Sequence, residues 1–120
     1  MSKIIFIDDE EEMLVEVKAL LEYRGHTVLT TPNPEEGIRL ISESQPEIAF
    51  IDIRIPGSNG INVLKRAKAT NLKLKVIILS GYQDEANEKK AISAGANLYL
   101  RKPVGFEELE NAISKVLATT

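Results

Sequence analysis

The sequence contains no cysteine and no long apolar run, and its charge is close to balanced. Without cysteine, a disulfide framework and a cysteine nucleophile are excluded, and a reducing cytoplasm is the expected location. The apolar run Ile4–Ile7 is interrupted at Asp8, too early for a signal peptide or a membrane span. The net charge is −3, so the sequence has no excess of basic residues that would indicate binding to nucleic acid. We therefore expect no membrane partner and no direct binding of nucleic acid.

The length and composition of the sequence are sufficient for a folded domain. Of the 120 residues, 43% are hydrophobic and 28% are charged, a balance typical of globular rather than disordered chains. This length allows a substantial buried core. No low-complexity segment or linker interrupts the sequence, so residues 1–120 are predicted to form a single domain.

Strand patterns and helix patterns alternate five times along the chain. Short runs rich in apolar and β-branched residues begin at Lys3, His26, Glu47, Lys75 and Asn97. Such alternation predicts an α/β fold, in which right-handed crossovers place helices on both faces of a parallel sheet. A closed barrel is excluded because it needs about 250 residues.

The polarity of each run predicts its place in the sheet. The runs at Glu47 and Lys75 are apolar throughout, as expected of central strands, whereas the run at His26 is more polar and suits an edge. We predict a doubly wound, flavodoxin-like sheet of order 2-1-3-4-5 with five helices. Two helical stripes are expected to face the core: Met13, Leu14, Val17, Leu20 and Leu21, and Phe106, Leu109, Ile113, Val116 and Leu117.

Polar residues follow four of the predicted strands at the point where each ends. They are Asp8-Asp9, Asp52, Ser80-Gly81 and Lys102-Pro103. The carboxyl ends of parallel strands open onto one edge of the sheet, where ligands bind. Three carboxylates, a hydroxyl and an ammonium are thus expected to converge.

This set of groups suits a divalent metal and a phosphoryl group. Adjacent carboxylates repel one another, and Mg²⁺ would remove that conflict while keeping positions for phosphate and water. Asp9 and Asp52 are predicted to ligate Mg²⁺ directly and Asp8 to act through a bound water. A carboxylate such as Asp52 can itself attack phosphorus and become an aspartyl phosphate. Lys102 and Ser80 would then contact phosphate oxygens, and Gly81 would leave room for the incoming group.

Five motifs in order resemble the receiver domain of bacterial two-component response regulators, over the whole chain. They are Ile-Asp-Asp-Glu at 7–10, Asp-Ile-Arg-Ile-Pro-Gly at 52–57, Gly60, Ser80-Gly81, and Tyr-Leu-Arg-Lys-Pro at 99–103. The resemblance implies that Asp52 is the phosphoacceptor and that Asp9, Asp52 and the backbone carbonyl of Arg54 bind Mg²⁺. It implies phosphate contacts from Lys102 and Ser80.

The same resemblance assigns roles to residues around the pocket. Tyr99 would be a switch aromatic that repacks when Ser80 moves, and Pro103 would follow a cis peptide bond. Arg54 and Tyr82 would flank the pocket and tune dephosphorylation. The output surface would be the fourth helix, fifth strand and fifth helix, within residues 83–118.

A receiver of this kind needs other proteins. His26 is the only histidine and precedes an edge strand, so we do not expect it to be a phosphohistidine donor. The phosphoryl group would come from a sensor histidine kinase or phosphotransfer protein, and the signal would pass to a downstream output protein or domain, or to a phosphorylation-dependent homodimer. The chain would not be a conventional enzyme, since it would at most catalyse its own phosphotransfer and autodephosphorylation.

Three alternatives remain open from the sequence. The chain is either free-standing or the receiver part of a longer regulator with a DNA-binding or enzymatic output domain. A receiver-like interaction domain that is never phosphorylated is a second reading. A phosphatase of the haloacid dehalogenase type is a third reading. Those enzymes carry an Asp-x-Asp motif at the end of the first strand. In this sequence the residue two positions after Asp52 is Arg54 and not a second aspartate.

Overall fold

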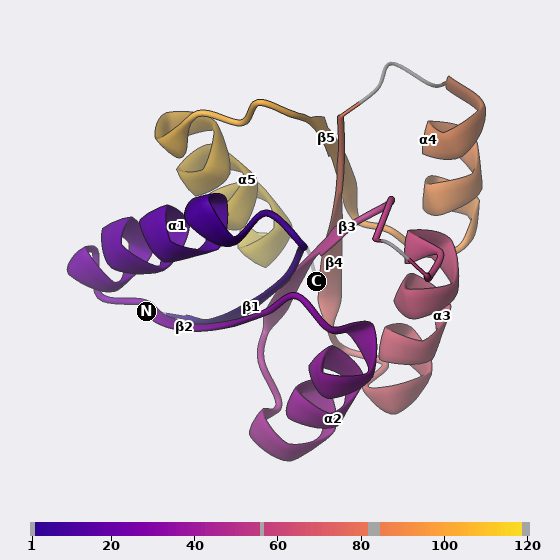
Figure 1. Ribbon diagram of the computed structural model, residues 1–120, viewed down its shortest axis with the longest axis horizontal. Coiled ribbons are helices and arrows are strands. Elements are labelled where there is room, and N and C mark those ends of the chain that lie inside the picture. Colours follow the sequence, from indigo (N-terminus) through magenta and orange to yellow (C-terminus); the bar gives the residue numbers. More distant parts are fainter. Residues whose placement is uncertain (1, 56, 82–84, 119–120) are drawn as a thin grey trace.

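The computed structural model describes residues 2–55, 57–81 and 85–118. It contains a central sheet with α1 and α5 on one face and α2, α3 and α4 on the other (Figure 1). The elements are β1 (Lys3–Ile7), α1 (Glu11–Tyr23), β2 (Thr27–Thr31), α2 (Pro34–Ser44), β3 (Ile48–Asp52), α3 (Gly60–Thr70), β4 (Lys75–Ser80), α4 (Glu85–Ser93), β5 (Leu98–Arg101) and α5 (Phe106–Ala118).

The sheet has the order β2-β1-β3-β4-β5 and every pairing is parallel, as predicted. Its register decides which strand ends become neighbours. Ile7 pairs with Ile51, so the residues that follow them, Asp8 and Asp52, lie side by side. Ser80 pairs with Arg101, which places Lys102 just beyond the end of β4.

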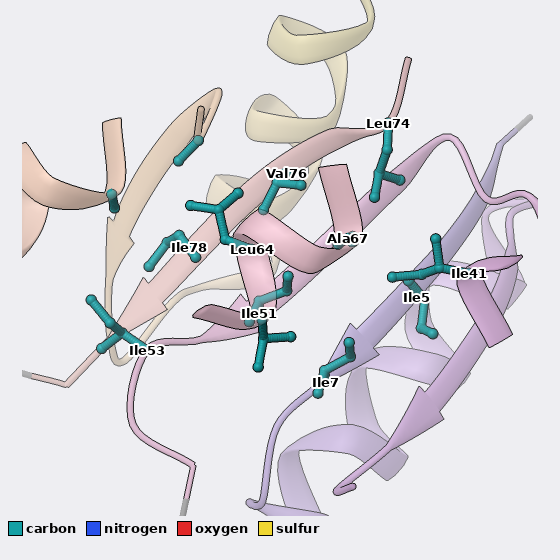
Figure 2. Close-up of a cluster of buried hydrophobic side chains, with 14 of the residues drawn as sticks. Ile5, Ile7, Ile41, Ile51, Ile53, Leu64, Ala67, Leu74, Val76 and Ile78 are labelled. Carbon is teal, nitrogen blue, oxygen red and sulfur yellow. The ribbon is translucent and has the colours of Figure 1, made fainter. Parts of the chain in front are cut away.

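Alternate residues of each central strand enter two separate cores, because successive side chains of a strand point to opposite faces. On one face Ile5 and Ile7 pack with residues of α2, α3 and α4 (Figure 2). On the other, Ile4 and Phe6 pack under α1 and α5. The Phe6 and Phe50 rings stack with centroids 4.4 Å apart and join β1 to β3. Both strands are buried on both sides, so their carboxyl ends are held rigidly.

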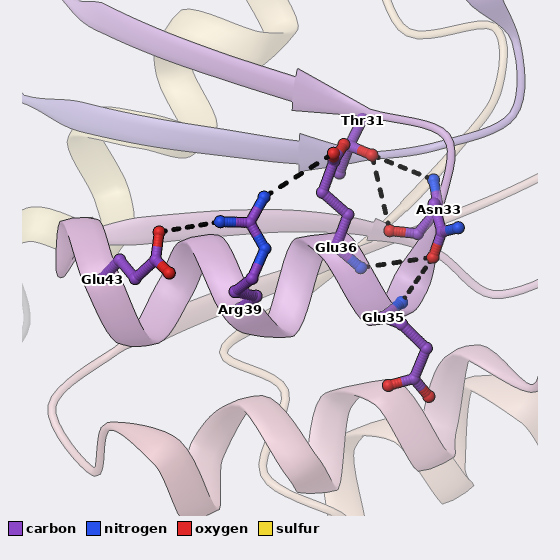
Figure 3. Close-up of polar contacts among 6 residues, drawn as sticks. All are labelled: Thr31, Asn33, Glu35, Glu36, Arg39 and Glu43. Carbon is purple, nitrogen blue, oxygen red and sulfur yellow. Dashed lines mark hydrogen bonds and ion pairs between the residues drawn. The ribbon is translucent and has the colours of Figure 1, made fainter.

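The start of α2 follows from its sequence. Asn33 is the N-cap, and its side-chain oxygen accepts hydrogen bonds from the backbone N–H groups of Glu35 at 2.8 Å and Glu36 at 3.2 Å (Figure 3). Pro34 occupies the first turn, where its missing N–H costs nothing. Arg39 pairs with Glu43 one turn later. The side-chain cap and the proline together account for where α2 begins.

The structure differs from the sequence-based expectations at a few positions. Leu20 and Leu117 belong to the predicted core stripes but are 37% and 39% exposed. Both lie at the margin of the apolar arc of their helix, about a quarter turn from its centre, so the sheet does not cover them. The second, third and fifth strands each begin one residue later than predicted, at Thr27, Ile48 and Leu98.

Gly60 is required where α3 passes the end of β3. A Cβ on Gly60 would lie 2.4 Å from Ile53 Cα and 2.6 Å from the carbonyl oxygen of Asp52. We expect Gly60→Ala to push α3 from the Asp52 backbone and to lower the free energy of unfolding by about 1–3 kcal/mol. Gly105→Ala is the matched control, because a Cβ there meets none of the described atoms within 4 Å. Equal urea midpoints for the two variants would contradict this packing.

Candidate functional site

The ends of β1, β3, β4 and β5 bring Asp8, Asp52, Ser80 and Lys102 to one edge of the sheet. The Lys102 ammonium lies 2.8 Å from Asp8 Oδ2 and 3.2 Å from Asp52 Oδ2. Asp8 is fully buried, and the side chains of Asp52 and Lys102 are only 8% and 13% exposed. Residues separated by up to 94 positions in the sequence are thus neighbours, as the strand-end pattern predicted.

Asp52 stands in a setting that disfavours its ionised form. Burial raises the pKa of the Asp52 carboxyl, and the nearby charge of Asp8 adds to the rise. Two contacts oppose it: the backbone N–H of Arg54 donates to Asp52 Oδ1 at 3.1 Å, and Lys102 donates to Oδ2. The opposing contacts do not cancel burial, so Asp52 is a carboxylate that gains from an added cation.

Lys102 is held as a cation in spite of its burial. Burial alone would lower the pKa of its ammonium, but the close contacts with the carboxylates of Asp8 and Glu10 and the charges of Asp8 and Asp52 outweigh burial and raise it. The contact with Asp8 Oδ2 is an ion pair rather than a directed hydrogen bond, because that oxygen accepts no well-oriented hydrogen bond within the described residues.

Glu10 is a third acid at this edge, and its contact was not predicted. Its Oε1 lies 2.6 Å from Lys102 Nζ, the shortest of the three ion pairs that Lys102 makes with described residues. The run of Glu10, Glu11 and Glu12 at the start of α1 is explained by the helix dipole alone and does not indicate an ion pair with Lys102. Its position directly after Asp8-Asp9, beyond the end of β1, was the available signal.

Asp9 is the predicted metal ligand that the structure does not bring into this cluster. Within the described parts of the chain, the acids whose ligand atoms lie within 4.8 Å of one another are Asp8, Glu10 and Asp52. Asp9 is exposed and lines an adjoining groove of about 460 Å³ together with Arg54, Asn59 and Lys90. Asp9 and Arg54 thus face one space beside Asp52.

The remaining predicted residues lie around the same edge. Ser80 is buried, and its carbonyl accepts a hydrogen bond from the Lys102 backbone N–H at 2.7 Å. A Cβ on Gly81 would meet none of the described atoms within 4 Å, which agrees with room for an incoming group. The Lys102-Pro103 peptide bond is cis, as predicted. Tyr82 lies outside the described residues.

Tyr99 of β5 packs against the core cluster beneath α3 and α4. Its hydroxyl is buried and has no hydrogen-bond partner in the part of the chain that the structure describes. An unpaired buried hydroxyl costs about 1–3 kcal/mol.

The donor set fits a hard divalent cation. Carboxylate oxygens are the ligands that Mg²⁺ and Ca²⁺ prefer, and three acids here share a single ammonium. The buried Asp8 Oδ2, with only an ion pair to satisfy it, gives a second reason for a cation at this point. A bound divalent ion would offset the repulsion between Asp8 and Asp52.

Asp52→Asn is expected to stabilise the metal-free protein at neutral pH. The folded state raises the Asp52 pKa, so it binds a proton more tightly than the unfolded chain does. The stabilising effect of that proton is complete below the unfolded pKa of about 3.9 and is lost as the pH rises through the folded pKa. At pH 7 the ionised carboxylate is a cost that asparagine removes, by about 1 kcal/mol.

The measurement is urea unfolding in EDTA at pH 7 and at pH 3.5. The Asp52→Asn gain should be present at pH 7 and largely absent at pH 3.5, where Asp52 is already protonated. Asp9→Asn, at the exposed acid outside the cluster, is the control and should change stability much less. A loss of stability in Asp52→Asn at pH 7 would show that Asp52 is not a strained carboxylate.

Comparison with known proteins identifies the family of this chain. The profile of the response regulator receiver domain matches residues 4–114. The chain belongs to this family. Receiver domains are signalling switches of two-component systems rather than conventional enzymes. Among the described residues, no helix is both long enough and apolar enough to cross a bilayer.

Relatives of this receiver domain differ in length. Protein PilH of Pseudomonas aeruginosa is 32% identical over 120 residues, which cover 98% of this chain and 99% of PilH. The transcriptional regulatory protein AfsQ1 of Streptomyces coelicolor is 29% identical and covers 98% of this chain, but the match spans only 52% of AfsQ1. A crystal structure of a CheY-like receiver domain from Methanospirillum hungatei has a TM-score of 0.93 at 29% identity, covering 98% of this chain and 94% of that one.

Proposed function

We propose that this receiver domain is a phosphorylation-activated switch in which Asp52 accepts a phosphoryl group. The observation that carries the proposal is the Lys102 ammonium between the buried carboxylates of Asp8 and Asp52 at the end of β3. A carboxylate oxygen of Asp52 attacks phosphorus, the bond from phosphorus to the donor breaks, and the donor leaves with the electron pair. The donor is a phosphohistidine on a sensor kinase or phosphotransfer protein, or a small acyl phosphate.

The reaction depends on Mg²⁺, which supplies charge neutralisation for the phosphoryl oxygens when bound. We assign its protein ligands as Asp9, Asp52 and the backbone carbonyl of Arg54, with Asp8 acting through water. The shared groove of Asp9 and Arg54 beside Asp52 supports this set. Lys102 then contacts one phosphate oxygen and Ser80 another, since both lie at strand ends adjoining β3 or β4. Arg54 and Tyr82 set how quickly water reaches the aspartyl phosphate.

Phosphorylation changes the surface formed by α4, β5 and α5. Ser80 moves toward the phosphate, Tyr99 repacks, and the affinity of this surface for an output protein, an output domain or a second copy of the chain changes. Such a shift requires that the phosphate contact the active state better than the resting state. The Tyr99 hydroxyl is buried and has no hydrogen-bond partner among the described residues, which supports a second position for this side chain.

Nuclear magnetic resonance with the phosphate mimic beryllofluoride tests the switch. With Mg²⁺ and beryllofluoride, we expect large shifts for the amides of Asp52, Ser80, Tyr99 and Lys102, extending into α4. The same mixture should leave Asp52→Asn unshifted beyond the effect of Mg²⁺. Shifts confined to residues within contact of Asp52 would mean that phosphorylation does not reach the output surface.

A further inference from the structure

Glu10 occupies the N-cap position of α1 without capping the helix. Its backbone is extended, with φ −84° and ψ 90°, and its side chain makes no hydrogen bond to the first turn. The side chains that ordinarily accept from the free N–H groups of a helix start are those of Ser, Thr, Asp and Asn, and glutamate is not among them. The Glu10 carboxylate lies 2.6 Å from the Lys102 ammonium. Glu10 therefore makes its side-chain contact across the pocket and not with the first turn of α1.

The backbone of Glu10 is held in place by hydrogen bonds at its N–H and at its carbonyl. Its N–H donates to Asp8 Oδ1 at 3.0 Å, and its carbonyl accepts from the N–H of Leu14 at 3.0 Å. Asp8 is fully buried and so provides a rigid anchor. The same carboxylate therefore positions Glu10 through one oxygen and pairs with Lys102 through the other.

The three acids around Lys102 are not equivalent. Asp8 and Asp52 belong to the buried pocket, whereas the Glu10 side chain is 58% exposed. The contact with Asp52 is the longest of the three, at 3.2 Å. The Lys102 ammonium thus lies closer to the Glu10 carboxylate than to Asp52 Oδ2, to which it also donates a hydrogen bond. A move of Lys102 onto a phosphoryl group on Asp52 would break its contact with Glu10.

We propose that Glu10 is a positioning residue that holds Lys102 in a resting position and releases it when Asp52 carries a phosphoryl group. Glu10 then lowers the affinity of the pocket for a phosphate-like anion, because part of the binding free energy is used to break the Glu10–Lys102 ion pair. Glu10 acts through Lys102 and not as a ligand of its own. The inference rests on the proposed function, since it assigns Lys102 to phosphate.

A double-mutant cycle on beryllofluoride affinity at saturating Mg²⁺ tests the coupling. Glu10→Gln should bind beryllofluoride about fivefold more tightly than wild type, a size typical of coupling between contacting charges. In the Lys102→Met background, the same substitution should change affinity less than twofold. Glu12→Gln is the matched control, because it removes an equal charge from the exposed first turn of α1.

The outcome that overturns the proposal is an equal effect of Glu10→Gln in both backgrounds, which would mean that Glu10 acts only through its charge. A second measurement needs neither metal nor a Lys102 variant. In EDTA, the ammonium signal of Lys102 in ¹⁵N spectra should be resolved and protected in wild type and in Glu12→Gln, and broadened or lost in Glu10→Gln. An unchanged Lys102 signal in Glu10→Gln would exclude the resting contact. Absence of beryllofluoride binding in wild type would refute the proposed function instead and leave this signal informative.

Discussion

Acetyl phosphate and Mg²⁺ are expected to phosphorylate the wild-type chain and to leave Asp52→Asn unlabelled. An amide cannot attack phosphorus as a carboxylate does, so we expect labelling to fall more than about a hundredfold. The fold should survive the change, because asparagine matches aspartate in shape and the wild-type carboxylate is held at a cost. Intact mass spectrometry would measure the added phosphoryl mass.

Asp9→Asn and chelation provide the comparisons for this prediction. Removing Mg²⁺ with EDTA should abolish labelling of the wild type, and Asp9→Asn should weaken labelling in a way that higher Mg²⁺ concentrations restore. Undiminished labelling of Asp52→Asn would place the acceptor elsewhere. Labelling that persists in EDTA would contradict the metal assignment while leaving Asp52 as acceptor.

Lys102→Met is expected to be the most destabilising single change at the site. Lys102 is the cation shared by Asp8, Glu10 and Asp52, and the first and last of these are buried. Methionine keeps the apolar stem but leaves the buried carboxylates of Asp8 and Asp52 without the cation they share, which costs about 3 kcal/mol or more. The loss should shrink at acid pH as Asp52, whose pKa burial raises, becomes protonated. Urea unfolding in EDTA would measure it.

Mg²⁺ should recover part of this loss, because a divalent cation replaces the missing ammonium and binding to the folded state stabilises it. Lys115→Met is the control: Lys115 is exposed in the last turn of α5, and its removal should cost no more than about 0.5 kcal/mol. A Lys102→Met protein as stable as Lys115→Met in EDTA would show that the ion pairs contribute nothing to the fold.

The fold was predictable because each strand carries a strong local signal. The apolar runs of β3 and β4 indicated central strands, and the polar residues after β1, β3, β4 and β5 marked the edge where the site lies. Details that depend on tertiary context were not predictable. Gln45 ends α2 in the left-handed conformation, with φ 52°, a position where glycine would be the usual signal.

The site was predictable in its members but not in how their charges pair. Strand ends place Asp8, Asp52 and Lys102 at one edge, yet the position of a long side chain within that edge depends on which carboxylates are nearest. Lys102 reaches Glu10, an acid whose place at the start of α1 is equally well explained by the helix dipole. Asp9 follows Asp8 directly but faces the adjoining groove. Consecutive residues beyond a strand end turn in different directions, and the spacing alone does not say which one turns inward.

A crystal structure of the chain with Mg²⁺ and beryllofluoride would show whether Asp52 is the phosphoacceptor and whether Lys102 leaves Glu10. We expect beryllium bonded to an Asp52 carboxylate oxygen, with the Lys102 ammonium on one fluoride, the Ser80 hydroxyl on another, and the contact between Lys102 and Glu10 broken. Beryllofluoride bound at another residue, or Lys102 still paired with Glu10 and remote from the fluoride, would contradict this expectation.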